Sequence, residues 1–220
     1  MQFKLTVDCV VLAYDHTLNR LLVLLTKRSK EPQLGRWALP GGFVTRTEEF
    51  IHTAQRKLEE ETGVRDLYLE QLKAYSLTDA SIHNRIASVA FYALLKWADY
   101  APMLVDTNRN QWVPVNQMPA LPFDHPQKVA DALTRLKQTI KTSPVAFYLL
   151  PIKFSLKQLQ QVYELIYGYL VDTRNFRKGV KGLPYITAIN EVESNVSHRP
   201  AQLYRFDLNS YQVFTATETV

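Results

Sequence analysis

The feature that most constrains the fold of this chain is the spacing of glycine, glutamate and arginine in residues 42–64. Apolar residues recur there at helical spacing, which predicts an amphipathic helix packed on a sheet. Glycine often follows the last residue of a helix because it tolerates a left-handed backbone. We therefore expect a helix that begins near Thr45 or Thr47 and ends at Gly63. Its apolar stripe consists of Ile51, Ala54 and Leu58.

This segment resembles the Nudix box, in which carboxylates on one helix hold Mg²⁺ for the hydrolysis of nucleoside diphosphate derivatives. One specified position departs from the box, because Lys57 stands where the pattern has glutamate. The resemblance implies helices around a mixed sheet, with Glu60 and Glu61 at metal-ligand positions and Arg56 as an orienting arginine. The matching residues are Gly42, Glu48, Arg56, Leu58, Glu60, Glu61, Gly63 and Val64.

Lys57 changes the chemistry that this helix is expected to support. Residues 57, 60 and 61 share one helix face, and one lysine with two glutamates gives this face a charge of −1, where a third glutamate would give −3. We therefore expect weak Mg²⁺ binding, no required cofactor and no enzyme activity beyond weak residual hydrolysis. Lys57 is then available to contact a ligand phosphate. The alternative is that Lys57 points to solvent and a base elsewhere serves an active hydrolase.

The composition is that of an ordinary globular protein, with 46% hydrophobic and 21% charged residues. The net charge of +5 permits nucleic acid binding without demanding it. Cys9 is the only cysteine, so no intrachain disulfide can form and a reducing compartment is expected. No signal pattern and no apolar run long enough to span a membrane is found, and we expect a cytoplasmic protein.

The first two thirds of the chain alternate between strand and helix patterns. Residues 5–14 and 21–26 are β-rich runs separated by a turn-forming segment, which predicts a hairpin. Further strands are expected at 67–74, 85–95 and 111–115, followed by a helix at about 126–141. Together with the box helix, this pattern predicts a Nudix α/β/α sandwich.

A second unit follows a proline-containing connector. Ser155 and Gln158 fit a capping box before an amphipathic helix, and Asp172 is expected to cap a second, short helix. Strands at 185–192 and 202–206 complete the outline of a winged helix-turn-helix. We therefore expect an effector-sensing domain at 1–143, a linker at 144–152 and a DNA-binding domain at 153–220.

The short helix carries a basic stripe on one side and the apolar residues Phe176 and Val180 on the other. A helix of this kind docks by its apolar side and presents its cations to the major groove of DNA. Charge stripes are more often solvated faces, but a further base at the tip of the hairpin favours DNA binding. The expected DNA contacts are Arg174, Asn175, Arg177, Lys178, Lys181, His198 and Arg199.

A degenerate Nudix box followed by a winged helix resembles the NrtR-type transcription regulators. The resemblance includes residues 35–43, the segment 121–125, residues 175–178 and the segment 199–204. It implies a homodimer that binds palindromic operator DNA and senses a small effector, either ADP-ribose or a related NAD metabolite, or a sugar such as arabinose. Whether the effector releases or promotes DNA binding stays open. Two other functions also stay open: an active Mg²⁺-dependent hydrolase, and a winged helix that binds protein and not DNA. The expected effector contacts are Arg28, Arg56, Lys57, Glu60, Glu61 and Arg85.

Overall fold

The structure is a computed structural model that describes residues 3–65, 67–77, 85–97, 108–194 and 199–218. In these residues seven strands form one mixed sheet in the order β3-β2-β1-β6-β5, with β4 paired to β1 and β7 paired to β2. The central strand β1 runs parallel to β6 and antiparallel to β2. The strands are β1 (Phe3–Asp15), β2 (Arg20–Lys27), β3 (Trp37–Ala38), β4 (Gly41–Phe43), β5 (Tyr68–Leu77), β6 (Arg85–Leu95) and β7 (Asn110–Pro114).

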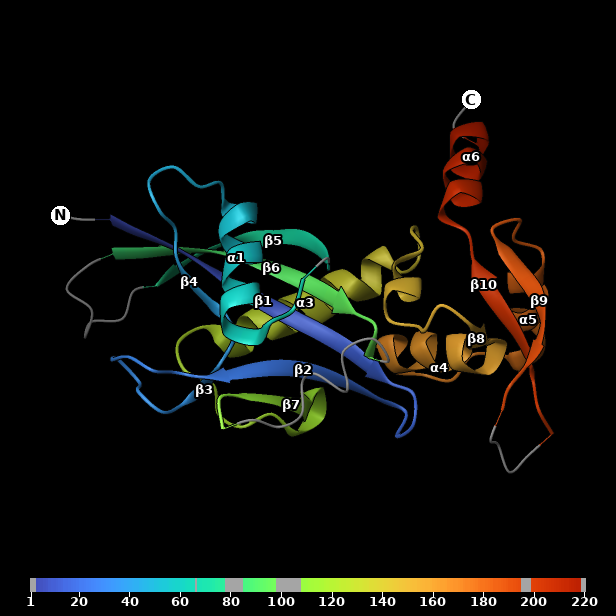
Figure 1. Ribbon diagram of the computed structural model, residues 1–220, viewed down its shortest axis with the longest axis horizontal. Coiled ribbons are helices and arrows are strands. Elements are labelled where there is room, and N and C mark those ends of the chain that lie inside the picture. Colours follow the sequence, from blue (N-terminus) through green and yellow to red (C-terminus); the bar gives the residue numbers. More distant parts are fainter. Residues whose placement is uncertain (1–2, 66, 78–84, 98–107, 195–198, 219–220) are drawn as a thin grey trace.

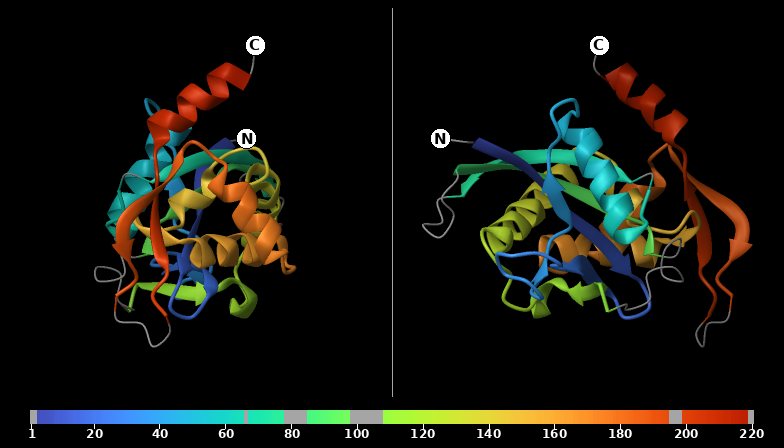
Figure 2. Two further views of the ribbon diagram at one scale, coloured as in Figure 1. Left: turned by 90° about the vertical axis from the view of Figure 1, so that its right-hand side faces the viewer. Right: turned by 60° about the vertical axis from the view of Figure 1, so that its left-hand side comes forward.

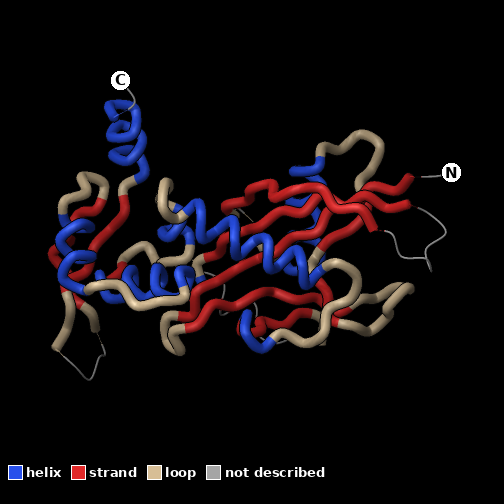
Figure 3. The backbone as a smooth tube through the Cα atoms, turned by 180° about the vertical axis from the view of Figure 1, so that it is seen from behind, coloured by secondary structure: helices blue, strands red, loops and turns tan. Residues whose placement is uncertain are grey.

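Two helices cover the opposite faces of this sheet, α1 (Phe50–Thr62) on one side and α3 (His125–Thr139) on the other (Figures 1 and 3). Alternate residues of β1 pack in the two layers on either side of the sheet, because successive side chains of a strand point to opposite faces. Cys9 is buried in the cluster under α1, whereas Val10 and Leu12 are buried in the cluster under α3. The expected α/β/α sandwich is therefore confirmed, with the strand hairpin at its centre.

The box helix ends where the sequence predicts, but it begins later. Gly63 follows the last helical residue with a φ of 74°. The expected start near Thr45 or Thr47 is wrong, because α1 begins at Phe50. Residues 45–49 form a turn in which the Thr45 hydroxyl and the Thr53 hydroxyl both donate to the Glu48 carboxylate. These side-chain bonds replace the helical hydrogen bonds that the earlier start would have required.

The C-terminal part has the elements of a winged helix, drawn in orange and red in Figure 1. Its described strands form a separate sheet in the order β8-β10-β9. The strand pair and both helices confirm the sequence prediction, whereas β8 and the last helix, which extends away from the body in Figure 2, were not predicted. The elements are β8 (Phe154–Ser155), α4 (Leu156–Tyr167), α5 (Thr173–Lys181), β9 (Ile186–Val192), β10 (Gln202–Phe206) and α6 (Leu208–Glu218).

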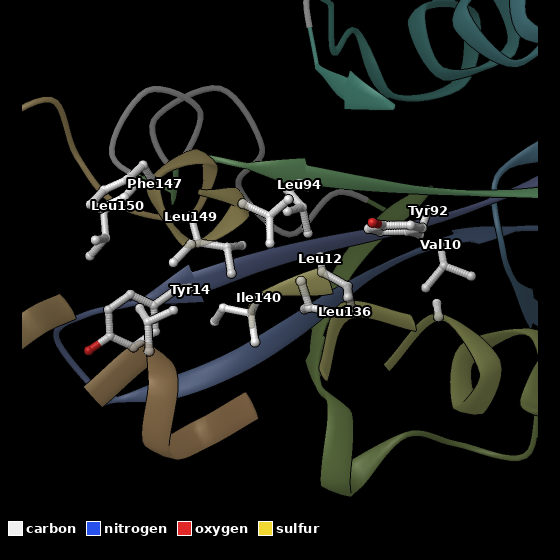
Figure 4. Close-up of a cluster of buried hydrophobic side chains, with 14 of the residues drawn as sticks. Val10, Leu12, Tyr14, Tyr92, Leu94, Leu136, Ile140, Phe147, Leu149 and Leu150 are labelled. Atoms are coloured by element: carbon white, nitrogen blue, oxygen red, sulfur yellow. The ribbon is translucent and has the colours of Figure 1, made fainter. Parts of the chain in front are cut away.

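The connector between the two parts is itself buried in the hydrophobic core. A short 3-10 helix, Val145–Tyr148, buries Phe147, and Leu149 and Leu150 follow it with almost no exposed surface. In Figure 4 these side chains lie beside Ile140 of the segment after α3 and beside Tyr14 of β1. The same buried cluster extends to residues of α4, α5, β9 and β10. One continuous apolar core therefore joins the sheet to the winged helix.

Replacing Ser155 by alanine is expected to lower the free energy of unfolding by about 1 kcal/mol, because it removes the N-cap of α4. The Ser155 hydroxyl accepts from the Gln158 backbone N–H, and the Gln158 side chain accepts from the Ser155 N–H. Urea-induced unfolding measures the change. Ser29→Ala, at an exposed loop serine, is the control and should leave the midpoint unchanged. An equal loss in both variants would contradict the role of the cap.

Candidate functional sites

The orienting arginine of the box lies at the centre of an ion-pair network. Arg56 Nε is 2.6 Å from Glu48 Oε1, and Arg56 Nη2 is 2.7 Å from Glu48 Oε2. Arg56 Nη1 is 3.0 Å from Glu60 Oε1. The hydrogen bonds from Arg56 lower the pKa of Glu48 to about 2. The turn before α1 is therefore fixed to the helix by a bidentate, charge-assisted pair.

Lys57 occupies the place where the box expects a third carboxylate. Its Nζ lies 2.7 Å from Glu60 Oε2, and only 22% of its side chain is exposed. The Lys57 side chain passes directly over Gly42, where a Cβ would come within 2.6 Å of Lys57 Cε. Glu60 is thus paired at both oxygens, and the hydrogen bond from Lys57, followed by that from Arg56, lowers its pKa. The alternative in which Lys57 merely points to solvent is contradicted by this packing.

Glu61 is hydrogen-bonded to the glycine strand β4. Its Oε2 accepts a hydrogen bond of 3.2 Å from the Gly41 N–H, and burial raises its pKa. Glu48, Glu60 and Glu61 together with Arg56 and Lys57 carry a net charge of −1, from three acids and two bases. Among the residues that the structure describes, no three His, Cys, Asp or Glu side chains are grouped to hold a metal ion. The side chains present therefore do not fit the three-carboxylate Mg²⁺ site that the box fold implies.

Two of the expected effector contacts lie apart from these residues. The Arg28 guanidinium stacks 5.0 Å from the centre of the Phe123 ring, and its Nε donates to the Pro32 carbonyl. Arg85 lies opposite Phe3 at the start of β1, whereas Gly41 lies opposite Asp8. Five residues of strand span roughly 17 Å. The structure brings together Arg56, Lys57, Glu60 and Glu61, but no described contact joins Arg28 or Arg85 to them.

The basic helix α5 is placed as the sequence predicts. Its inner side packs through Val180, which is buried, and through Phe176, whose ring lies 5.4 Å from that of Tyr163 in α4. Asp172 caps the helix, because its carboxylate accepts from the Asn175 N–H at 2.7 Å. The outer side presents exposed polar and basic residues, and we call this set the α5 face. It consists of Arg174, Asn175, Arg177, Lys178 and Lys181.

The hairpin of β9 and β10 stands beside α5 as a wing (Figure 2). Arg199 is exposed in the loop that joins β9 to β10, while His198, the other expected contact, lies outside the described residues. Lys153 at the start of the domain binds both carboxylate oxygens of Glu191 in β9, each at 2.7 Å. This ion pair ties the wing to the strand that precedes α4.

Comparisons with known proteins match both parts of the chain. Residues 2–136 match the NUDIX domain family, and residues 146–206 match the NrtR DNA-binding winged helix domain. The ADPR responsive transcriptional repressor NtrR of Acinetobacter baylyi is 32% identical over 213 residues, 94% of this chain and 83% of that protein. The chain belongs to the NrtR family of Nudix-related transcription regulators.

Solved structures of the NrtR family place the same parts together. The crystal structure of Shewanella oneidensis NrtR complexed with a 27mer DNA is 32% identical, with a TM-score of 0.84 over 94% of this chain and 95% of that chain. The NUDIX domain of the same protein, crystallised with ADP ribose, is 35% identical, with a TM-score of 0.50 over 62% of this chain and 90% of that chain. None of the described helices here is long and apolar enough to cross a membrane.

One charged cluster of this NrtR-family chain was not predicted. Lys128 of α3 is completely buried, with its Nζ 2.7 Å from Asp8 Oδ2 in β1 and 2.8 Å from Asp124 Oδ1. Burial alone would raise the pKa of Asp8, but the neighbouring His125 ring, the Lys128 ammonium and the hydrogen bonds that Lys128 and Ser88 donate outweigh it and lower that pKa. Asp8 shares strand parity with Val10 and Leu12, which both face α3. This parity was the signal in the sequence, because a carboxylate among buried neighbours requires a buried partner.

Proposed function

We propose that this chain binds operator DNA through the α5 face and the wing, and that its Nudix domain senses ADP-ribose or a related NAD metabolite. The observation that carries the proposal is the likeness to one relative over both domains, since that relative was crystallised on DNA and its NUDIX domain with ADP ribose. The exposed cations of the α5 face support the first half. The box residues, with Lys57 among them, support the second.

We further propose that the chain senses its effector without cleaving it. The ammonium of Lys57 fills the position of a catalytic carboxylate and neutralises one oxygen of Glu60, which disfavours a dication at this helix. An ammonium beside a half-buried carboxylate is instead suited to a ligand phosphate that brings its own negative charge. Arg56 and Lys57 are the proposed diphosphate contacts. Arg28 and Arg85 would meet the parts of a ligand that extend beyond them.

We also propose a homodimer on a palindromic operator, because a two-fold dimer would present two recognition helices to two half-sites. We propose the effector-sensing domain at 1–143, the connector at 144–152 and the DNA-binding domain at 153–220. The retained carboxylates of Glu60 and Glu61 favour one second candidate, a slow Mg²⁺-dependent hydrolase of ADP-ribose.

Gel-shift titration of the DNA beside the protein's own gene tests the proposal. We expect a sequence-specific shift whose midpoint changes when ADP-ribose is added, and no such change with arabinose. Incubation of the same protein with ADP-ribose and Mg²⁺ should release no AMP at ordinary enzyme rates. Specific binding that responds only to arabinose would replace the proposed effector, and absence of any specific shift would refute regulation.

Replacing Arg177 by alanine is expected to weaken operator binding by about 1–3 kcal/mol, or roughly five- to 150-fold, if its guanidinium reads a base edge. Arg177 is exposed on the outer side of α5 and takes no part in the buried packing of the helix. Lys30→Ala removes one positive charge from an exposed loop of the Nudix domain and serves as control. Equal affinities of the two variants, measured by fluorescence anisotropy, would exclude Arg177 from the interface.

A further inference from the structure

The glycine pair in β4 lies between two charged side chains from different layers. On the α1 side, Lys57 covers Gly42 in the space that a Cβ would need. At Gly41, a Cβ would come within 2.3 Å of the Val7 carbonyl oxygen and within 2.8 Å of Asp8 Oδ1. β4 thus lies against Lys57 at Gly42 and close to the Asp8 carboxylate at Gly41.

The Asp8 carboxylate is bonded to the first turn of α3. Asp8, whose side chain is only 13% exposed, receives the Lys128 ammonium at 2.7 Å and the Ser88 hydroxyl. A second link runs beside it, because the Leu39 N–H just before the glycines donates to His125 Nδ1 at 3.0 Å. Burial lowers the pKa of His125, which favours the neutral ring that this acceptor role needs. Asp8 of β1, the strand paired with β4, and Leu39, which lies two residues before β4, are thus both bonded to α3.

The other end of α3 is tied to the DNA-binding helices. Lys137 Nζ donates to the Tyr167 carbonyl at 2.6 Å, at the last residue of α4. Leu136 and Ile140 share a buried cluster with Leu159 of α4. The helix has 15 residues, a length of about 22 Å at about 1.5 Å per residue. Figure 3 shows it crossing the face of the sheet toward the winged helix.

Between these ends, α3 is fixed to the edge strand β5 by polar pairs. The Tyr75 hydroxyl donates to Asp131 at 2.7 Å, and Arg135 Nη1 donates to Glu70 at 2.9 Å. Such pairs are directional. A displacement of α3 relative to β5 would therefore have to break these hydrogen bonds or exchange their partners. Coupling between distant sites is carried by rigid elements that adopt discrete arrangements of this kind.

We propose that α3 joins the effector site to the DNA-binding helices, and that Lys128 and Lys137 are the positioning residues at its two ends. The inference rests on the proposed function, because it concerns how effector binding changes operator affinity. A ligand that displaces β4 changes the environment of Asp8, the Asp8–Lys128 pair passes the change to α3, and Lys137 passes it to the end of α4. Neither lysine is among the proposed effector or DNA contacts.

The test measures operator affinity of the full chain with and without saturating ADP-ribose and takes the ratio of the two dissociation constants. Lys137→Met should bring this ratio at least fivefold closer to one, within the range of typical coupling. Its ADP-ribose affinity, measured by calorimetry without DNA, should stay within about twofold of the wild-type value. Lys137→Arg, which keeps the donor, should restore the ratio. Lys73→Met is the matched control, because Lys73 pairs with Asp131 of the same helix but only at the surface.

The buried end needs a milder substitution, since Lys128→Met leaves two carboxylates without their cation. Asp8→Asn removes the negative charge and keeps the side-chain size. It should also bring the ratio of the two dissociation constants closer to one. The double variant with Lys137→Met should lose no more coupling than the more affected single variant, because both act on one path. A wild-type ratio of one would refute the proposed function itself. A wild-type response that Asp8→Asn and Lys137→Met both leave intact would overturn the role of α3 while the function stands.

Discussion

Lys57→Glu is expected to convert the box site into a Mg²⁺ site and to give measurable hydrolysis of ADP-ribose. The change removes the ammonium that lies 2.7 Å from Glu60 Oε2. It also supplies a third carboxylate on the helix face of Glu60 and Glu61. The charge of the five box side chains becomes −3, from four acids and one base, where the native set carries −1.

The size of the effect follows from simple electrostatics. One pair of unit charges at about 4 Å interacts by about 1 kcal/mol even in water, and a dication feels a change of two charges. At least tenfold tighter Mg²⁺ binding, about 1.4 kcal/mol, is therefore a conservative expectation after solvent screening. Calorimetric titration with Mg²⁺ measures this step. AMP release from ADP-ribose measures turnover, which should depend on Mg²⁺ and exceed the wild-type rate by at least a hundredfold.

Lys57→Gln separates the two contributions of this residue. It removes the positive charge without adding a ligand, so Mg²⁺ binding should improve slightly and hydrolysis should stay absent. Both variants should lose affinity for ADP-ribose in the absence of metal, because the proposed phosphate contact is gone. A folded Lys57→Glu protein that neither binds Mg²⁺ more tightly nor releases AMP would show that position 57 is not what separates sensing from hydrolysis.

Much of the fold was predictable because local signals and tertiary packing agree. Gly63 ends α1, Ser155 and Asp172 begin α4 and α5, and the inner residues of α5 are those expected. The start of α1 was not predictable from spacing, since Glu48 is held in a turn by Arg56 from the following helix. Local sequence patterns do not show that Glu48 pairs with Arg56 and so stays outside the helix.

The site residues also divide into contacts that local spacing predicts and contacts between residues far apart in the sequence. Helical spacing places Lys57 beside Glu60, and that prediction needs no tertiary information. The Asp8–Lys128 pair spans 120 positions of sequence, so only the parity of β1 hinted at it. Pairing of β4 with β1 was also missed, because three residues are too few for a periodic signal.

Phe147→Ala is expected to lower the free energy of unfolding by about 3–5 kcal/mol, the usual range for a buried phenylalanine. Phe147 is 8% exposed, and its ring stacks on Phe206 of β10 at 4.3 Å and meets Phe154 of β8 at 5.5 Å. It therefore fills the apolar contact between the connector and the wing sheet. Phe43→Ala is the matched control, because Phe43 is 55% exposed and its loss should change stability by less than about 0.5 kcal/mol.

The same variant tests whether the shared core makes the two domains unfold together. The three tryptophans all precede residue 113, so their fluorescence reports the Nudix domain, whereas far-UV circular dichroism reports the whole chain. We expect coincident urea transitions in the native protein, because one buried cluster extends from β1 to β10. In Phe147→Ala the dichroism should begin to fall before the fluorescence changes, because the winged helix loses the ring contacts of Phe154 and Phe206 with the connector. Coincident transitions in the variant, with a loss below about 1 kcal/mol, would mean that the domains are joined through α3 and α4 alone.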